Sequence, residues 1–190
     1  METGILTTLS EQELIDCDEV FNSGCTMGSL KDAYLFIVLD GGYVPIRTTH
    51  TPVLSECVTR VGCGEKAATI DCFCKVRVNN ELAKIRAVAR QPVVVGIEVS
   101  GLDLKLTFFV VQMGIFRGKA GPRLNHQEAI IGYGIEKGVD YWLLKNSWGP
   151  KWGENGYFRI ERNVREIGGK CGLAMRAFFL VKIWGELPFC

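Results

Sequence analysis

The sequence has no marked excess of charge of either sign and no long hydrophobic run. Its 190 residues carry a formal net charge of +1, and its Lys and Arg residues are scattered along the chain. Without a basic stripe, the chain is poorly suited to bind nucleic acid or an anionic membrane. The longest apolar stretches, 92–99 and 107–116, are too short for a membrane-spanning helix. We therefore expect neither nucleic acid nor a membrane as a partner, and we expect a monomer.

Export signals are missing from the printed sequence as well. The first residues, METGILTT, are neither basic nor apolar enough for a signal peptide, and the tripeptide Asn-x-Ser/Thr does not occur. A chain translated as printed is therefore expected to stay in the cytosol.

What is present is an ordinary globular composition, with helix signals near the start. A chain that is 47% hydrophobic and 23% charged can form one sizeable core or two small ones. Two capping-box patterns, Ser10 with Glu13 and Ser29 with Asp32, predict helices that begin just after each serine. The segment 43–79 is turn-rich and is expected to be irregular.

Strand signals dominate the rest of the chain. Asn80 can cap one short helix, after which β-branched and aromatic runs alternate with Gly-containing turns. The runs that predict strands are PVVVGIEV (92–99), AIIGYG (129–134), YWLLKN (141–146), GYFRIE (156–161) and AFFLVKI (177–183). We therefore predict two domains, 1–79 with the first helices and 80–190 with the strands.

Two polar residues stand at the ends of neighbouring predicted strands. His126 precedes AIIGYG and Asn146 ends YWLLKN, and the short turn between these runs places the strands side by side. An imidazole can hold the proton of an attacking thiol, and an amide oxygen that accepts its second ring N–H fixes the ring without adding charge. Trp148 and Trp152 would cover this contact, and excluding water strengthens such a hydrogen bond.

These residues stand in runs that resemble the C-terminal signature of papain-like cysteine proteases. The resemblance rests on LNHQEAIIGYG, KNSWGPKWGENGYFRI and GGKCGLA, in this order, and on LSEQELIDCD near the start. It implies an α+β papain-like fold, with a helical domain and an antiparallel β half-barrel that carries the histidine and asparagine. It also implies a cysteine-type peptidase with His126 as acid/base, Asn146 as its orienter and no cofactor or metal. Peptides, proteins and protease inhibitors are the implied partners, in a lysosome, a vacuole or the extracellular space.

The family's nucleophilic cysteine belongs to a CGSCWAF-like segment upstream of LSEQELIDCD, and that segment is not in this sequence. The resemblance therefore covers the C-terminal portion of the family, with the helical domain truncated at its N-terminus. Because the glutamine that donates to the oxyanion lies in the same segment, we expect no peptidase activity from the chain alone. Two alternatives stay open: a non-catalytic decoy that binds protease inhibitors or a propeptide, and an enzyme that is active only when an upstream fragment complements it.

The resemblance implies different pairing for different members of the eight cysteines. Cys17 and Cys57 fall where the family forms a disulfide bridge. Cys25 and Cys171 are expected to lack their usual partners, the second because Ala120 stands where the family has a cysteine. Cys25 could substitute for the nucleophile, although an unpaired structural thiol is the simpler interpretation. The cysteines without a family counterpart, which match no zinc pattern well, are Cys63, Cys72, Cys74 and Cys190.

Three positions near the expected site depart from the family. Gly28 keeps a glycine that lets a substrate backbone approach closely, but Met27 replaces a small neighbour. Gln127 would intrude where the family places the wall of its main specificity pocket. Glu128 would place a carboxylate in a strand that is normally buried, so either this strand is exposed or burial raises the pKa of Glu128. The simpler interpretation is that neither Gln127 nor Glu128 has a function.

Overall fold

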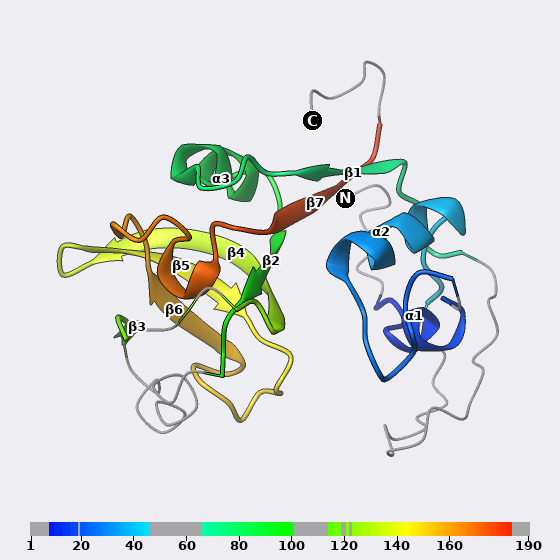
Figure 1. Ribbon diagram of the computed structural model, residues 1–190, viewed down its shortest axis with the longest axis horizontal. Helices are drawn as coiled ribbons and strands as arrows, with labels where there is room; N and C mark the ends of the chain where they lie inside the picture. Colours follow the sequence, from blue (N-terminus) through cyan, green and yellow to red (C-terminus); the bar gives the residue numbers. More distant parts are fainter. Residues whose placement is uncertain are drawn as a thin grey trace. The chain divides into compact units, whose positions relative to one another are not determined.

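The computed structural model describes residues 8–18, 20–45, 66–100, 114–118, 121 and 123–183 (Figure 1). The chain divides into two compact units, Met1–Phe73 with Leu180–Phe189, and Cys74–Phe179 with Cys190. The division at residue 79 that the sequence suggests stays a prediction. None of the helices in the described part of the chain is long and apolar enough to cross a membrane.

The first unit contains α1 (Gln12–Asp16) and α2 (Leu30–Leu39). The predicted cap of α2 is confirmed, because the Ser29 hydroxyl accepts a hydrogen bond from the backbone N–H of Asp32 at 3.4 Å. The helix buries Tyr34, Phe36 and Ile37. Tyr34 and Ile37, three residues apart, lie on one face of α2 and place it in the core of this unit.

The predicted capping box of α1 is wrong. Glu11 is the N-cap residue, and no side chain caps the helix. The fully buried carboxylate of Glu13 instead accepts hydrogen bonds from the Val44 backbone N–H at 2.9 Å and from the Lys66 ammonium at 2.8 Å. A buried carboxylate is strongly destabilising unless it is paired, so these contacts, distant in sequence, take the side chain away from the helix start.

The strands in the described part of the chain form one sheet of seven, in the order β1-β7-β2-β4-β5-β6-β3. The structure confirms the five strands that the sequence predicts. They are β2 (Val93–Ile97), β4 (His126–Glu136), β5 (Val139–Lys145), β6 (Tyr157–Glu161) and β7 (Ala177–Val181). β1 (Cys72–Lys75) lies in the segment expected to be irregular, and β3 (Ile115–Phe116) pairs parallel with β6. The other described pairs, β2 with β4 and β7, and β5 with β4 and β6, are antiparallel.

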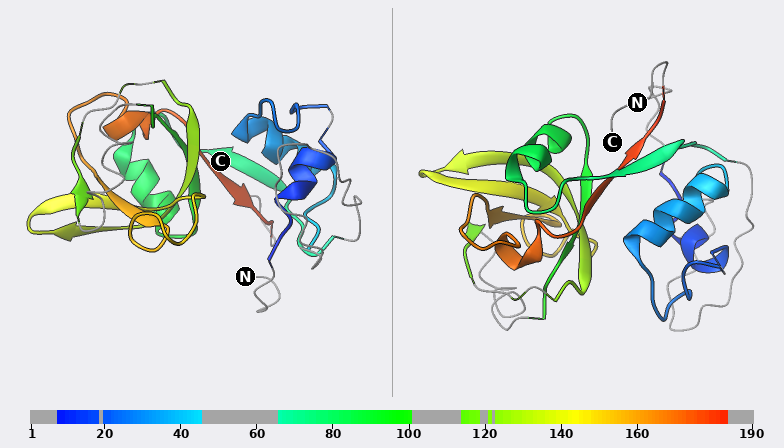
Figure 2. Two further views of the ribbon diagram at one scale, coloured as in Figure 1. Left: turned by 90° about the horizontal axis from the view of Figure 1, so that it is seen from below. Right: turned by 45° about the horizontal axis from the view of Figure 1, so that its top comes forward.

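The β4–β5 hairpin brings the first residue of β4 next to the last residues of β5, where the candidate site lies. Its two-residue turn consists of Lys137 and Gly138, both with positive φ, of 50° and 77°. Such a turn matches the twist of the flanking strands, and this confirms the predicted hairpin. β4 and β5 run side by side as a long ribbon (Figure 2).

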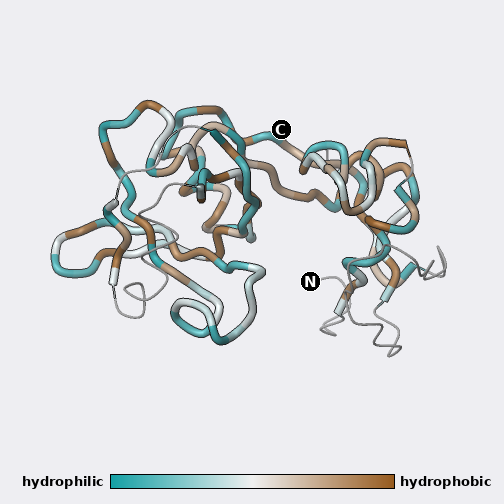
Figure 3. The backbone as a smooth tube through the Cα atoms, turned by 60° about the horizontal axis from the view of Figure 1, so that its bottom comes forward, coloured by the Kyte–Doolittle hydropathy of each residue, from teal (hydrophilic) through white to brown (hydrophobic). Residues whose placement is uncertain are grey.

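The core of the second unit is built from the inward residues of these strands. Val95, Ile97, Ile130, Leu144 and Ile160 are fully buried. The helix α3 (Glu81–Val88) packs against β4, and its predicted cap is confirmed by the Asn80 Oδ1, which accepts from the Ala83 N–H at 2.8 Å. The hydrophobic stretches of this unit can be followed along the chain in Figure 3. A short 3-10 helix, η3 (Lys170–Gly172), contacts β2.

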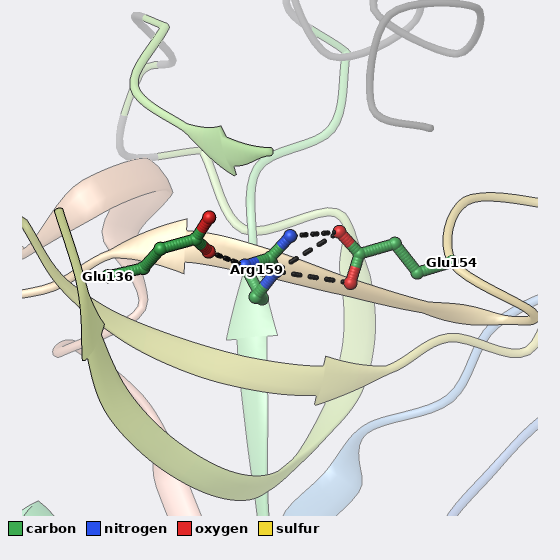
Figure 4. A network of polar contacts seen from close by, with 3 residues as sticks. All are labelled: Glu136, Glu154 and Arg159. Atoms are coloured by element: carbon green, nitrogen blue, oxygen red, sulfur yellow. Dashed lines mark hydrogen bonds and ion pairs between the residues drawn. The ribbon is translucent and has the colours of Figure 1, made fainter. Parts of the chain in front are cut away.

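An ion-pair network ties β6 to its neighbours at the sheet surface (Figure 4). The Arg159 guanidinium on β6 donates to both oxygens of Glu154 at 3.1 Å and also pairs with Glu136 at the end of β4. These carboxylates raise the pKa of Arg159, with the hydrogen bonds to Glu154 as the largest cause. The network is part of the scaffold at the end of the hairpin that lies away from His126.

Candidate active site

The structure brings His126 and Asn146 together at one end of the hairpin. His126 is the first residue of β4, and Asn146 follows the last residue of β5. The His126 Nε2 lies 3.1 Å from the Asn146 Oδ1. The backbone N–H of Ser147 donates to the same Oδ1 at 2.7 Å, so this atom is an acceptor. The proton of the contact therefore belongs to Nε2, which leaves Nδ1 as the nitrogen that can take up or release a proton.

Two tryptophans follow Asn146 in the loop before β6. The ring of Trp148 lies with its centroid 4.8 Å from that of His126, and the ring of Trp152 meets Trp148 edge-on at 5.1 Å. Trp152 is 4% exposed and packs in turn on Phe158, whereas Trp148 is 39% exposed. The Trp148 ring thus covers the imidazole, and it is supported by Trp152, which packs in the core.

The same face of β4 places a carboxylate beside the imidazole. Glu128, two residues after His126 along the strand, is 3% exposed, and its Oε1 lies 3.3 Å from the His126 Nε2. Of the two alternatives that the sequence offers, burial is the one observed. Burial raises the pKa of Glu128 to about 7, against an opposing effect of His126.

The contact with Glu128 also changes the pKa of His126. The pKa of His126 is raised, first by its contact with Glu128, and the hydrogen bond to Asn146 adds to this effect while burial opposes it. The histidine is therefore held in an environment that favours its charged form. The i, i+2 spacing of His126 and Glu128 on one strand could have predicted this pairing, although the simpler interpretation of the sequence assigned Glu128 no function.

The two other departures from the family lie on the surface. Gln127 is exposed, on the face of β4 opposite to His126. In the first unit Met27 is 73% exposed, and Gly28 lies against Asn22, whose Oδ1 would be 3.0 Å from an added Cβ. The glycine therefore has a local reason to lack a side chain. A role for Gly28 in substrate binding stays a prediction.

Five cysteines lie in the described part of the chain. Three of them, Cys17, Cys25 and Cys74, are disulfide-bonded. The predicted partner of Cys17, Cys57, lies outside the described residues, so this pairing stays a prediction. The expectation that Cys25 is unpaired, and could act as a substitute nucleophile, is wrong because its sulfur is engaged in a disulfide.

The other two described cysteines are free thiols. Cys171 is free and buried, as expected, and burial raises the pKa of its thiol to about 12. Cys72 is half-buried on β1. Within the ranges that the structure describes, no cluster of three or more His, Cys, Asp or Glu side chains could hold a metal ion. Cys63, Cys190 and Ala120 lie outside those ranges.

Comparison with known proteins identifies the class. Residues 1–181 match the model of the family described as papain family cysteine protease. The chain belongs to this family. Among solved structures, the ragweed pollen allergen Amb a 11, a cysteine protease in its proform, shares 35% identity at a TM-score of 0.83, over 96% of this chain and 55% of that one. Bromelain from Ananas comosus, solved with the E64 inhibitor, shares 32% identity at a TM-score of 0.78, over 94% and 80%. The fold is therefore the α+β papain-like fold.

Among the curated relatives of this chain are plant proteases. A cysteine proteinase of Brassica napus is 43% identical over 185 residues, which are 95% of this chain and 54% of the relative. The oryzain beta chain of Oryza sativa subsp. japonica is 43% identical over 189 residues, which are 98% of this chain and 39% of the relative. This chain spans about half the length of these curated relatives, or less.

Proposed function

We propose that the chain supplies the histidine and asparagine of a cysteine-type peptidase site, with His126 as general acid/base and Asn146 as its orienter. The observation that carries the proposal is the 3.1 Å contact between Nε2 and an oxygen that also accepts from Ser147. This contact fixes the tautomer with the proton on Nε2. The Nδ1 can then take the proton of a thiol and later deliver it to the leaving amine of a peptide.

The nucleophile is the group that the described residues do not readily supply. Three of the five described cysteines are disulfide-bonded, and the raised pKa of Cys171 keeps that thiol protonated at neutral pH. We propose that hydrolysis requires the thiol of the family's cysteine-bearing segment and that the 190-residue chain is inactive without it. Peptides or proteins are the proposed substrates, and Gly28 is proposed to help bind the substrate backbone.

The compartment is proposed from the family. Plant cysteine proteases are among the relatives of this chain, and we propose a lysosomal, vacuolar or extracellular location. These relatives give no support to the cytosolic location expected from the printed sequence alone.

Complementation tests the proposed function. The chain is co-refolded with a fragment of the Brassica napus relative that carries the cysteine helix, and cleavage of a fluorogenic peptide is followed. Cleavage should appear only when both chains are present. It should vanish with His126→Ala, and also when the fragment's cysteine is replaced by serine. Absence of cleavage from a complex that size-exclusion chromatography shows to be formed and folded would overturn the proposal.

A second candidate function is an inhibitor-binding decoy. It is favoured by one combination of features: His126, Asn146 and their tryptophan cover are in place, while four of the five described cysteines cannot act as a thiolate at neutral pH. Such a chain could bind a cystatin-type inhibitor without cleaving peptides. Calorimetric titration of the chain with a cystatin should then show saturable binding, and the absence of binding by the folded chain would reject this function.

A further inference from the structure

We propose that Glu128 is a second positioning residue for His126, which shares the Nε2 proton with Asn146 and stabilises the imidazolium through an ion pair. The inference concerns the site of the proposed function and rests on it for its catalytic meaning. The neutral histidine–asparagine contact becomes, in this chain, a charged group of three side chains. We draw this from the geometry at the end of the β4–β5 hairpin.

Strand geometry explains why the three groups converge. Side chains at His126 and Glu128 point to the same face of β4, because alternate residues of a strand share a face. The β4–β5 register pairs Ala129 with Lys145, so Asn146 stands one step further, opposite Glu128. The His126 Nε2 is therefore placed 3.1 Å from the amide oxygen of Asn146 and 3.3 Å from the carboxylate of Glu128.

The carboxylate has little else to interact with. Both Glu128 oxygens are buried and make no hydrogen bond with the part of the chain that the structure describes. An ionised carboxylate in such a place is costly unless a positive charge lies close by. His126 is the group that can provide this charge, and it can do so only by taking a second proton, on Nδ1.

The surroundings add no competing charge among the described residues. On β2, Val95 lies opposite Glu128 and Ile97 lies opposite His126, and both are fully buried. The β5 side presents the neutral Asn146, and the uncharged Trp148 ring covers the imidazole. Burial alone raises the pKa of Glu128, and His126, the one charged group in the described part of the chain that acts on it, opposes this effect. The two groups therefore titrate as a pair rather than one by one.

Glu128 affects the protonation of His126 in a definite direction. With Glu128 ionised, the imidazolium has a partner and keeps its proton to higher pH. With Glu128 neutral, this support is lost. A thiolate beside His126 depends on the same imidazolium, so the carboxylate would extend the pH range over which such an ion pair survives. Glu128 acts through His126 and needs no contact with a substrate.

Nuclear magnetic resonance titration of the 190-residue chain tests the inference. The chain has two histidines, His50 and His126, so His50→Gln assigns their ring signals. Glu128→Gln should lower the titration midpoint of His126 by about one pH unit or more. Equal His126 midpoints in the two proteins would overturn the inference.

A swap variant provides the matched control. Glu128→Gln combined with Gln127→Glu keeps the composition and moves the carboxylate to the exposed face of β4. It should titrate like Glu128→Gln alone, and recovery of the original midpoint would contradict the proposed geometry. If these variants fail to fold, the unaltered chain still decides: the Glu128 carboxyl carbon and the His126 ring should show the same two steps, and separate single steps would reject the pairing. The titration needs no peptide hydrolysis, so a failed complementation leaves its result valid.

Discussion

Glu128 should make the free energy of unfolding fall as the pH rises from about 4.5 to about 7. The pKa of this carboxyl is raised from 4.5 to about 7 in the folded chain, chiefly by burial. Below the lower value the group is protonated in both states and has no effect. Between the two values the unfolded chain loses the proton and the folded chain keeps it, so unfolding becomes easier. Above the upper value both states are ionised, and the loss of stability is complete.

The size of the effect follows from the difference between the two values. A change of about 2.5 pKa units, from 4.5 to about 7, corresponds to roughly 3 kcal/mol at about 1.4 kcal/mol per unit. The raised pKa of His126 acts in the same direction, because its stabilisation is present below the unfolded value and is lost as the pH rises through the folded one. The lowered pKa values of Asp71 and Glu166 act only as the pH falls.

Urea unfolding followed by tryptophan fluorescence at several pH values measures this. Glu128→Gln should be about as stable as the parent chain near pH 5 and more stable by roughly 3 kcal/mol near pH 8. The difference between the two proteins cancels the contributions of titrating groups that do not interact with Glu128. A difference that does not change with pH, at unchanged denaturant slope, would refute the reasoning.

Three further predictions use the same unfolding assay. Lys84 is buried, and burial lowers its pKa to about 8. Its charge is therefore destabilising below that pH, and the free energy of unfolding should rise between about pH 8 and 10.5. Lys84→Met should be neutral or stabilising by about 1–4 kcal/mol at pH 7, and a large loss of stability would contradict this. Gly42 has φ +136°, and an added Cβ would lie 2.2 Å from a backbone oxygen. Gly42→Ala should therefore lower the free energy of unfolding by about 1–3 kcal/mol. Gly41→Ala should cost clearly less, because nothing lies within 4 Å of a Cβ added there, and equal costs would disprove the close approach. Arg159→Met should cost about 1 kcal/mol at low salt and less at high salt, whereas a salt-independent cost would show that packing, not charge, is lost.

The parts that the sequence could predict are those set by local spacing. The five strands, the hairpin turn at Lys137 and Gly138, and the caps at Ser29 and Asn80 depend on residues close together in the chain. The same hairpin brings His126 and Asn146 together, because their strands are joined by a two-residue turn. Local signals were therefore sufficient for the frame of the candidate site.

The parts that the sequence could not predict depend on distant partners. The capping box at Ser10 failed because Glu13 is used by Lys66, a contact across 53 residues. Cys25 is disulfide-bonded although its family partner is missing from the sequence, and such a bond depends on which chain segments meet in space. Burial of Glu128 was one of two alternatives, but its position beside His126 needed the pairing of the strands.

The central claim is that His126, oriented by Asn146, is the imidazole that activates a thiol. The most direct measurement is the pH dependence of alkylation of the cysteine in the complementing fragment, with His126 present or replaced by alanine. With His126 the cysteine should react as a thiolate well below neutral pH, and with His126→Ala its pKa should return to about 8.5. Identical profiles in the two complexes would contradict the claim.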